Sequence, residues 1–403
     1  MYSRHLDTAI ETALTDTPAV FVNGARQTGK STMVRNFGGE YLTFDDSTVL
    51  GAARSDLDAF VRGLPSRAVI DEVQRIPDLA RVLKASIDRD RKPGRFILTG
   101  SANVMLLPRM SDSLAGRMEV LTLWPLSVGE IESRRETFLD RLFQRSVNFP
   151  LPSKRSGWLN RALTGGFPEA VSRRTAERRQ AWFRSYLTTI LERDVRDLAN
   201  IEGLTAMPRL LTLLASRLGG LLNFASLSTD MAMPQTTLKR YLTLLETVFL
   251  IRLLPPWHTN LGLRLIKSPK LYLLDSGLAA HLSGATPEQI RTQPRWSGPL
   301  FENFIVMELT KQASWSKRPP GLFHYRSLAG QEVDILVESP AGQVVGIEVK
   351  AAASVGAQDF RGLKSLAEAI GKKFHRGIVL YAGDEAVAFG DRLWAVPWDV
   401  ITG

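Results

Sequence analysis

Residues 24–31, Gly24-Ala25-Arg26-Gln27-Thr28-Gly29-Lys30-Ser31, directly follow a short apolar run, Ala19–Asn23 (AVFVN). The eight residues fit G-x-x-x-x-G-K-[ST], a loop in which glycines let backbone N–H groups converge on phosphate oxygens. A helix that begins at the loop adds a favourable dipole for an anion. The stretch therefore predicts a strand, a phosphate-binding loop and a helix, in that order.

The residue types in this loop predict how ATP and Mg²⁺ would be held. The Lys30 ammonium would reach the β- and γ-phosphates, and the Ser31 hydroxyl would coordinate Mg²⁺. Nucleotide contacts are expected from the whole loop and the residue after it: Gly24, Ala25, Arg26, Gln27, Thr28, Gly29, Lys30, Ser31 and Thr32.

Two further apolar runs end in polar residues. Val69-Ile70 leads into Asp71 and Glu72, and Phe96–Thr99 leads into Gly100 and Ser101. Because parallel strands bring their carboxyl ends to one edge of a sheet, these side chains are expected beside the phosphates. Asp71 would hold Mg²⁺ through water, Glu72 would polarise the attacking water, and Ser101 would hydrogen-bond the γ-phosphate or that water.

Phosphoryl transfer in such sites usually needs one more cation at the γ-phosphate, often from a neighbouring subunit. The candidates are Arg117, in Leu-Ala-Gly-Arg, and Arg193, in Leu-Glu-Arg-Asp-Val-Arg-Asp. The sequence does not choose between them, and each is equally suited to a structural salt bridge.

The first 125 residues alternate strand-like and helix-like segments. The predicted strands are Ala19–Asn23, Tyr41–Phe44, Ala68–Asp71 and Phe96–Thr99. Such alternation favours a parallel sheet covered on both faces. Residues 126–200 are predicted to be mostly helical. Residues 201–265 are predicted to form three helices and an extended segment, a winged-helix-like module in which Lys239 and Arg240 alone are basic on the recognition helix.

Residues 266–403 return to mixed α/β patterns. A helix at Leu300–Lys311 precedes strand-like runs at Phe323–Tyr325, Glu332–Glu338 and Val344–Lys350, then a helix near Asp359–Ala369 and a strand at Gly377–Tyr381. Asp334 and Glu348 on adjacent strands would bind Mg²⁺, Lys350 would orient a hydroxide or stabilise a pentavalent phosphate, and Glu302 would complete the acidic pocket. The alternative is that these charges only line the wet face of half-buried strands. The order of elements and D-x₁₃-E-x-K resemble the restriction-endonuclease-like PD-(D/E)xK domain.

The amino-acid composition limits the classes of partner, metal site and cellular location that remain. The 403 residues carry 51 Lys+Arg against 41 Asp+Glu, a net charge of +10, which favours nucleic acid or an anionic membrane surface as partner. There is no cysteine, which excludes disulfides, Cys-ligated zinc and thiol catalysis, and the five histidines lack metal-ligand spacing. The N-terminus has no apolar signal-peptide region and no run approaches 18 apolar residues. We expect a cytoplasmic protein without a membrane segment.

The whole chain resembles the bacterial and archaeal AAA-type P-loop ATPases that carry a C-terminal restriction-endonuclease-like domain of unknown function. The residues that carry the resemblance are, in order, GARQTGKS (24–31), VIDEVQ (69–74), FILTGSAN (96–103), LAGR (114–117), LWPLSVGE (123–130), GGFPEA (165–170), RDVRDL (193–198), LKRYLTLLETVFLI (238–251), LLPPW (253–257), KLYLLDSGLA (270–279), LFENFIVMEL (300–309), EVDILVE (332–338) and IEVK (347–350).

The resemblance implies an α/β protein with four parts. These are an AAA-like P-loop NTPase core with a parallel sheet (1–125), a helical lid-like region (126–200), a winged-helix-like module (201–265) and a restriction-endonuclease-like domain (266–403). It also implies a homo-oligomer and action on DNA.

Three functions are compatible with these patterns. The first is an ATP-driven oligomer that binds DNA, translocates on it or processes branched DNA. The second is a metal-dependent DNA nuclease gated by ATP. The third is a nucleotide-dependent switch that binds a protein, as in a toxin–antitoxin or stress-response system.

Overall fold

The computed structural model describes residues 2–101, 114–145, 149, 157–196, 204–258, 268–327 and 329–403. The chain divides into two compact units. The first comprises Met1–Leu126 and Thr243–Leu250, and the second Ser127–Leu242 and Ile251–Gly403. The predicted domain boundaries at 200 and 265 lie outside the described residues. Within the described ranges, no helix has the length and apolar character needed to cross a membrane.

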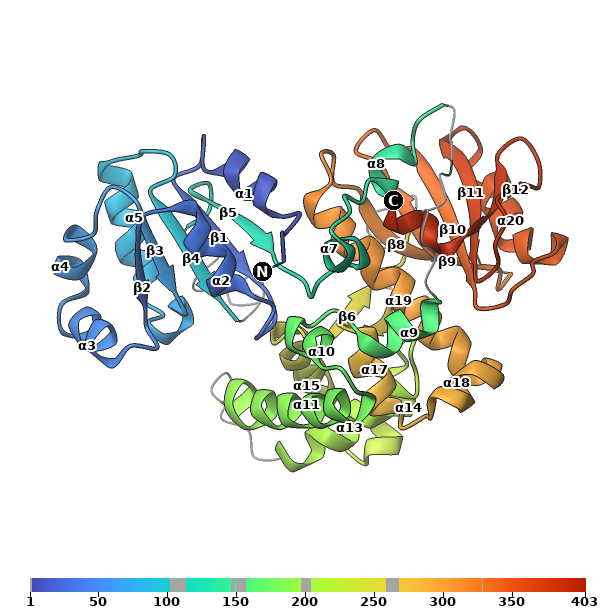
Figure 1. The fold of residues 1–403 in the computed structure, drawn as a ribbon, viewed down its shortest axis with the longest axis horizontal. Helices are drawn as coiled ribbons and strands as arrows, with labels where there is room; N and C mark the ends of the chain where they lie inside the picture. Colours follow the sequence, from blue (N-terminus) through green and yellow to red (C-terminus); the bar gives the residue numbers. More distant parts are fainter. Residues whose placement is uncertain are drawn as a thin grey trace. The chain divides into compact units, whose positions relative to one another are not determined.

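The first unit is built on a five-stranded parallel sheet (Figure 1). Its order is β2-β3-β4-β1-β5, with bounds β1 (Ala19–Asn23), β2 (Glu40–Thr43), β3 (Ala68–Asp71), β4 (Phe96–Gly100) and β5 (Met118–Thr122). The four predicted strands are present, with ends displaced by at most one residue. The fifth, β5, was not predicted. The parallel sheet expected from the alternation is thus confirmed.

Helices cover both faces of this sheet. Successive side chains of a strand point to opposite faces, so each strand contributes to two apolar cores. Val20 and Val22 of β1 share a core with α1 (Asp7–Ala13) and α2 (Lys30–Val34). Phe21, between them, lies in the other core, formed with α3 (Ser47–Ser55), α4 (Leu57–Arg62) and α5 (Leu79–Arg89). The continuous apolar strands are those of a sheet buried on both sides.

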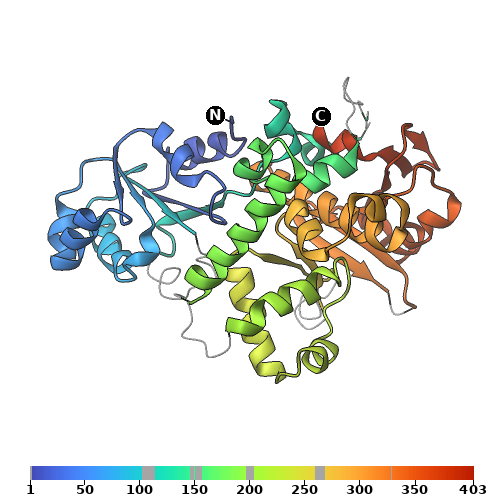
Figure 2. The same cartoon turned by 60° about the horizontal axis from the view of Figure 1, so that its bottom comes forward.

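The second unit begins with helices. They are α7 (Val128–Glu132), α8 (Phe138–Arg141), α9 (Trp158–Thr164), α10 (Pro168–Ser172) and α11 (Ala176–Thr189). From Ile190 to Val195, α11 continues as a π-helix, and Figure 2 shows the two as one long green helix. The prediction of a mostly helical region is correct for these residues.

Three helices follow, as predicted: α13 (Met207–Ala215), α14 (Phe224–Met231) and α15 (Gln235–Thr247). The extended segment after them is β6 (Ile251–Leu254), which pairs antiparallel with β7 (Lys270–Leu273). The next helices are α17 (Ser276–Ser283), α18 (Pro287–Thr292) and α19 (Pro294–Trp315). Three helices followed by a two-stranded ribbon are consistent with a winged helix, an identification that stays a prediction.

A six-stranded mixed sheet closes the chain, in the order β12-β13-β11-β10-β9-β8. Its strands are β8 (Gly321–Arg326), β9 (Glu332–Glu338), β10 (Val344–Lys350), β11 (Phe374–Tyr381), β12 (Val387–Ala388) and β13 (Leu393–Pro397). Helix α20 (Arg361–Ile370) packs on β9, β10 and β11, and α19 packs on β10. The helix–strand–strand–strand–helix–strand order matches the sequence pattern, whereas β12 and β13 were not predicted.

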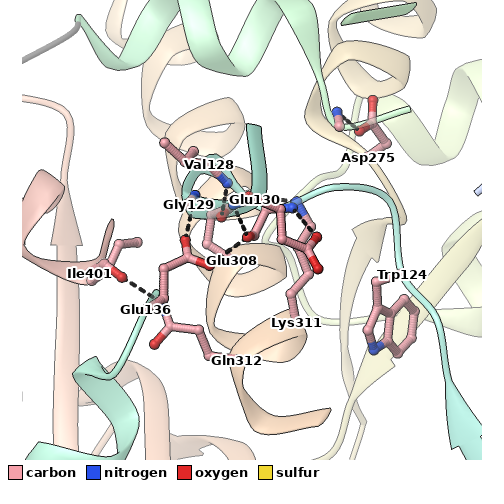
Figure 3. A network of polar contacts seen from close by, with 12 residues as sticks. Trp124, Val128, Gly129, Glu130, Glu136, Asp275, Glu308, Lys311, Gln312 and Ile401 are labelled. Atoms are coloured by element: carbon pink, nitrogen blue, oxygen red, sulfur yellow. Dashed lines mark hydrogen bonds and ion pairs between the residues drawn. The ribbon is translucent and has the colours of Figure 1, made fainter. Parts of the chain in front are cut away.

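A buried polar network ties α7 to α19 and to the last turn of the chain (Figure 3). The Val128 N–H donates to Glu308 at 3.0 Å, and Glu308 also pairs with Lys311. The Gln312 side chain donates to the Ile401 carbonyl at 2.6 Å. These bonds join residues up to 180 positions apart within the second unit.

Glu136 lies in the same network and is 2% exposed. It accepts hydrogen bonds from the Ser127 hydroxyl and from the Gly129 N–H, the latter at 2.9 Å. Burial, together with the nearby Glu308 carboxylate, raises the pKa of Glu136 to about 8. The folded chain therefore holds a proton on Glu136 at pH values where the unfolded chain has lost it.

This proton makes stability depend on pH. Because the folded pKa lies above the unfolded one, the free energy of unfolding falls as pH rises from about 4.5 to about 8, by up to ~1.4 kcal/mol per pH unit. We expect Glu136→Gln to flatten this loss and to stabilise the second unit at pH 8, but not at pH 4.5. Urea unfolding at three pH values measures it, with Glu288→Gln, an exposed carboxylate on α18, as the control for loss of one charge. Parallel pH curves for Glu136→Gln and the unaltered chain would contradict the assignment.

Candidate functional site

The loop after β1 has a backbone that only particular residues allow. Gly24 has φ +145°, and a Cβ there would lie 2.2 Å from the Leu123 carbonyl oxygen. Gly29 has φ +93° and Gln27 φ +61°, so the chain turns twice through the left-handed region before α2 begins at Lys30. Strand, loop and helix therefore occur in the predicted order, and the loop is a cradle of backbone that a side chain at Gly24 would destroy.

The Lys30 side chain lies inside this cradle. It is 5% exposed, and its Nζ donates to the Gly24 and Ala25 carbonyls at 3.0 and 2.9 Å. The Thr28 hydroxyl also donates to the Ala25 carbonyl, at 3.0 Å. Ser31 is partly exposed at the first turn of α2 and Thr32 is exposed beside it. A buried ammonium within the loop supplies the positive charge that a phosphate group requires.

Asp71 ends β3 at the same edge of the sheet, as predicted. It is 4% exposed, and each carboxylate oxygen accepts a hydroxyl: Thr99 donates to one and Tyr41 to the other. Burial and the hydrogen bond to Asp71 raise the pKa of Tyr41. The two hydroxyls fix the carboxylate, and its oxygens are ligands that Mg²⁺ prefers.

Glu72 and Ser101 are brought together by a residue that the sequence reasoning missed. The Gln74 side-chain amide donates to Glu72 and, at 3.0 Å, to the Ser101 hydroxyl. Glu72 itself has φ +60°, a left-handed conformation that costs a non-glycine residue about 1 kcal/mol or more. Strain and a dedicated hydrogen bond together point the Glu72 carboxylate in one direction. Gln74 is the last residue of the VIDEVQ motif, but nothing in the sequence showed that its side chain contacts Glu72 and Ser101.

Arg4 is a second residue that sequence reasoning missed. Its guanidinium is buried and donates to the Thr28 carbonyl at 2.7 Å and to the Trp124 carbonyl at 2.6 Å. The arginine therefore braces the phosphate loop against the segment that follows β5. No spacing rule links residue 4 to a loop that begins twenty residues later, so only the fold shows this contact.

The two candidate arginines lie in different places. Arg117 precedes β5 at the amino-terminal edge of the sheet, where Ala19 donates to its carbonyl, and its guanidinium pairs with Asp88 at 2.6 and 3.1 Å. The phosphate loop is at the opposite edge of that sheet, so Arg117 does not contact the loop of its own chain. Arg193 is exposed on the π-helix of the second unit. The prediction that either acts at the γ-phosphate from a neighbouring subunit stays untested.

The carboxyl-terminal carboxylates do gather, around a cation that was not predicted. Lys270 of β7 is 3% exposed, and its Nζ lies 2.9 Å from Glu302 and 2.8 Å from Asp334. The Tyr272 hydroxyl donates to Glu302 at 2.6 Å, and the Val349 N–H donates to Asp334 at 3.0 Å. Lys350 and Glu348 pair with one another at 2.9 Å, as expected for side chains on one face of a strand.

Burial and mutual repulsion alter the ionisation of this cluster. Burial, and then Asp334, raise the pKa of Glu302 to about 7 and that of Glu348 to about 8. Burial alone would lower the pKa of Lys270, but Asp334 and Glu302 outweigh it and raise that pKa. Burial and then Lys270 lower the pKa of His324 to about 4. Lys270 is therefore the firmly charged cation at the centre of the cluster.

In the ranges that the structure describes, no three His, Asp or Glu side chains are arranged to hold a metal ion together. The predicted cluster thus divides into two sets of ion pairs. Glu302 and Asp334 pair with Lys270, and Glu348 pairs with Lys350. Its use as a metal site stays a prediction.

Three family descriptions match successive parts of the chain. Residues 16–132 match an AAA domain. Residues 155–289 match a domain of unknown function, DUF8612, and residues 297–401 match another, DUF4143. The AAA match contains the phosphate loop, Asp71, Glu72 and Ser101, so the predicted AAA-type P-loop core is confirmed. The resemblance of the last part to PD-(D/E)xK nucleases is not addressed by its match.

Two relatives match this chain over nearly its full length, and a third matches part of it. Uncharacterized proteins from Mycobacterium bovis and Mycobacterium tuberculosis are each 33% identical over 392 residues, which is 96% of this chain and 82% of theirs. An uncharacterized protein from Haemophilus influenzae is 21% identical over 257 residues, 60% of this chain and 57% of its own.

A solved signal-transduction ATPase with numerous domains and a tetratricopeptide repeat sensor, from Pyrococcus horikoshii, is also similar. It is 11% identical over 78% of this chain and 47% of its own length, with a TM-score of 0.25, and a likeness so low supports no argument. The mycobacterial matches do establish kinship: this chain belongs to the same family as those two uncharacterized proteins, and its residues 16–132 are an AAA domain.

Proposed function

We propose that the chain is a Mg²⁺-dependent ATPase that converts ATP and water to ADP and phosphate. The observation that carries the proposal is the shared edge of the parallel sheet. There the Gly24 cradle follows β1, Asp71 ends β3 with Glu72 next to it, and Ser101 directly follows β4. The cradle, the buried Lys30 ammonium and the oxygen ligands Ser31 and Asp71 fit a metal–triphosphate in charge and in ligand chemistry.

Each residue has a separate task in this proposal. Lys30 and the loop N–H groups bind the phosphates, and Ser31 and Asp71 hold Mg²⁺, directly and through water respectively. When bound, Mg²⁺ neutralises negative charge that develops on the phosphate oxygens. Glu72, aimed by Gln74, orients the attacking water and accepts its proton. Arg4 keeps the loop in shape by bonding the Thr28 carbonyl.

Two substitutions separate binding from hydrolysis. Lys30→Ala should abolish nucleotide binding, because it removes the only buried ammonium described in the loop. Glu72→Gln should keep binding and slow hydrolysis by ~100-fold or more, because an amide cannot accept the water's proton. Phosphate release and titration with a fluorescent ATP analogue measure the two effects. Normal turnover by Glu72→Gln would show that another group acts on the water.

Gln74 is proposed as a positioning residue for Glu72. Gln74→Leu should lower kcat by ~10-fold or more and leave KM nearly unchanged, because the carboxylate loses its partner but the phosphate loop is intact. Gln74→Glu would place a second carboxylate there and should be slower still at high pH. If KM rises and kcat does not fall, the residue serves the fold of the loop instead.

We also propose DNA as the partner of the assembled protein. The net charge of +10 favours a polyanion. One continuous element contributes to it: α11 and its π-helical extension carry five arginines against three acidic residues, and four of the arginines are exposed, Arg178, Arg184, Arg193 and Arg196. Guanidinium groups spread along a helix suit contacts to backbone phosphates and not to particular bases.

The salt dependence of binding tests this surface. The logarithm of the affinity for duplex or four-way-junction DNA should fall linearly with the logarithm of salt concentration. Replacing Arg178, Arg184 and Arg193 by Ala should weaken binding for every sequence and make that slope shallower by about 2 to 3. A matched triple, Arg54, Arg62 and Arg81 to Ala, removes the same charge from exposed positions of the first unit. An equal loss of DNA affinity in both triple variants would show that net charge, and not the α11 surface, determines binding.

The same measurements distinguish the other functions. An ATPase that binds no DNA even at ~50 mM salt would favour the nucleotide-dependent protein-binding switch. A homo-oligomer is part of the proposal, because Arg117 does not reach the phosphate loop of its own chain. Mass measurement with and without ATP tests that assembly.

A further inference from the structure

The carboxyl-terminal acidic pocket already contains a cation. The Lys270 ammonium is buried and lies 2.8–2.9 Å from two carboxylates, Asp334 and Glu302. The sequence pattern predicted a metal bound by Asp334 and Glu348, with Glu302 completing the pocket. The Lys270 ammonium lies between Asp334 and Glu302, two members of that set. Lys270 comes from β7, a strand of the small β6–β7 ribbon and not of the six-stranded sheet that carries Asp334.

Three of the four oxygens of these carboxylates accept hydrogen bonds. The second oxygen of Asp334 accepts the Val349 N–H, and Glu302 accepts the Tyr272 hydroxyl in addition to Lys270. The remaining Glu302 oxygen faces Gly219, where a Cβ would lie only 2.8 Å away. Protein donors thus take up most of the oxygens that a metal ion would need, although Glu302 and Asp334 keep 16% and 13% of their side-chain surface exposed.

The charges of these side chains also disfavour a divalent metal ion in the pocket. Glu302, Asp334 and Glu348 face the two ammonium groups of Lys270 and Lys350, which leaves one formal negative charge when all are ionised. A divalent ion added to this set would leave an uncompensated positive charge in a buried place, which is strongly unfavourable. Without Lys270, two negative charges remain, which is the charge that a divalent ion neutralises.

We propose that Lys270 is a built-in counter-ion that occupies the carboxyl-terminal acidic pocket, excludes divalent metal from it, and locks β7 to α19 and β9. The domain then acts as a folded module held by internal ion pairs, and it does not cleave nucleic acid by metal-assisted hydrolysis. This assignment is independent of ATP hydrolysis and of DNA binding by the arginines of α11.

Metal uptake by the nucleotide-free full-length chain tests the proposal. Mn²⁺ binding is counted by electron paramagnetic resonance in the unaltered chain, in Lys270→Ala and in Lys270→Ala with Asp334→Asn. The phosphate loop is the same in all three, so differences report the pocket. We expect Lys270→Ala to bind one more Mn²⁺ per chain than the unaltered protein, and the added Asp334→Asn to abolish that gain. A folded Lys270→Ala chain with no gain would overturn the proposal.

A second measurement does not depend on a variant that folds. Hydrogen exchange of β9 and β10 in the unaltered chain should be the same with and without ~1 mM Mn²⁺, a concentration that fills even weak carboxylate sites. Slower exchange of these strands with Mn²⁺ would show that metal enters beside Lys270, and the proposal would fall. Unchanged exchange supports it, whatever the fate of the substituted chains.

Discussion

The parallel alignment of β1, β3 and β4 is the constraint on which the nucleotide site depends. Asn23 is level with Gly100 across the β1–β4 pair, and Ile70 is level with Leu98 across the β3–β4 pair. Parallel strands put all their carboxyl ends at one edge, so residues some 30 and 80 positions apart along the chain meet there. The loop, the acids and the serine each depend on this register, because a slip by one residue would turn every side chain to the other face.

In the second unit, buried polar contacts join elements that lie far apart in the sequence, as the apolar sheet does in the first unit. Glu308 joins α7 to α19, Asp275 both caps α17 and accepts the Gly166 N–H at 2.6 Å, and Lys270 joins β7 to α19 and β9. Such groups are expensive to bury unless all of their hydrogen bonds are made. They also accept few alternative arrangements, so we infer that they specify which elements pack together more than they add to stability.

The sequence was sufficient for features that repeat or that are close in the chain. Alternating runs predicted four strands of the first sheet, and the eight-residue loop predicted its own strand–turn–helix context. It was insufficient for contacts made only by tertiary structure. Gln74 reaches Ser101 27 residues away, and Lys270 reaches Asp334 64 residues away. Arg117 precedes β5, a strand that was not predicted, so the sequence did not show that this residue lies at the amino-terminal edge of the sheet. The short strands β12 and β13 lack a distinctive period and were missed for that reason.

Lys30 and Lys270 are both buried, but their surroundings suit them to different roles. Both ammonium groups are about 95% buried or more. Lys30 donates to two backbone carbonyls of the phosphate loop, whereas Lys270 bonds two carboxylates. An ammonium inside a phosphate loop lies where the phosphates of a nucleotide bind. A cation held by two anions is already compensated, and removing either partner from such a buried pair typically costs about 3–5 kcal/mol. The first lysine is therefore suited to receive a ligand and the second to stay where it is, which is why chemistry is expected at the amino-terminal sheet and structural support at the carboxyl-terminal one.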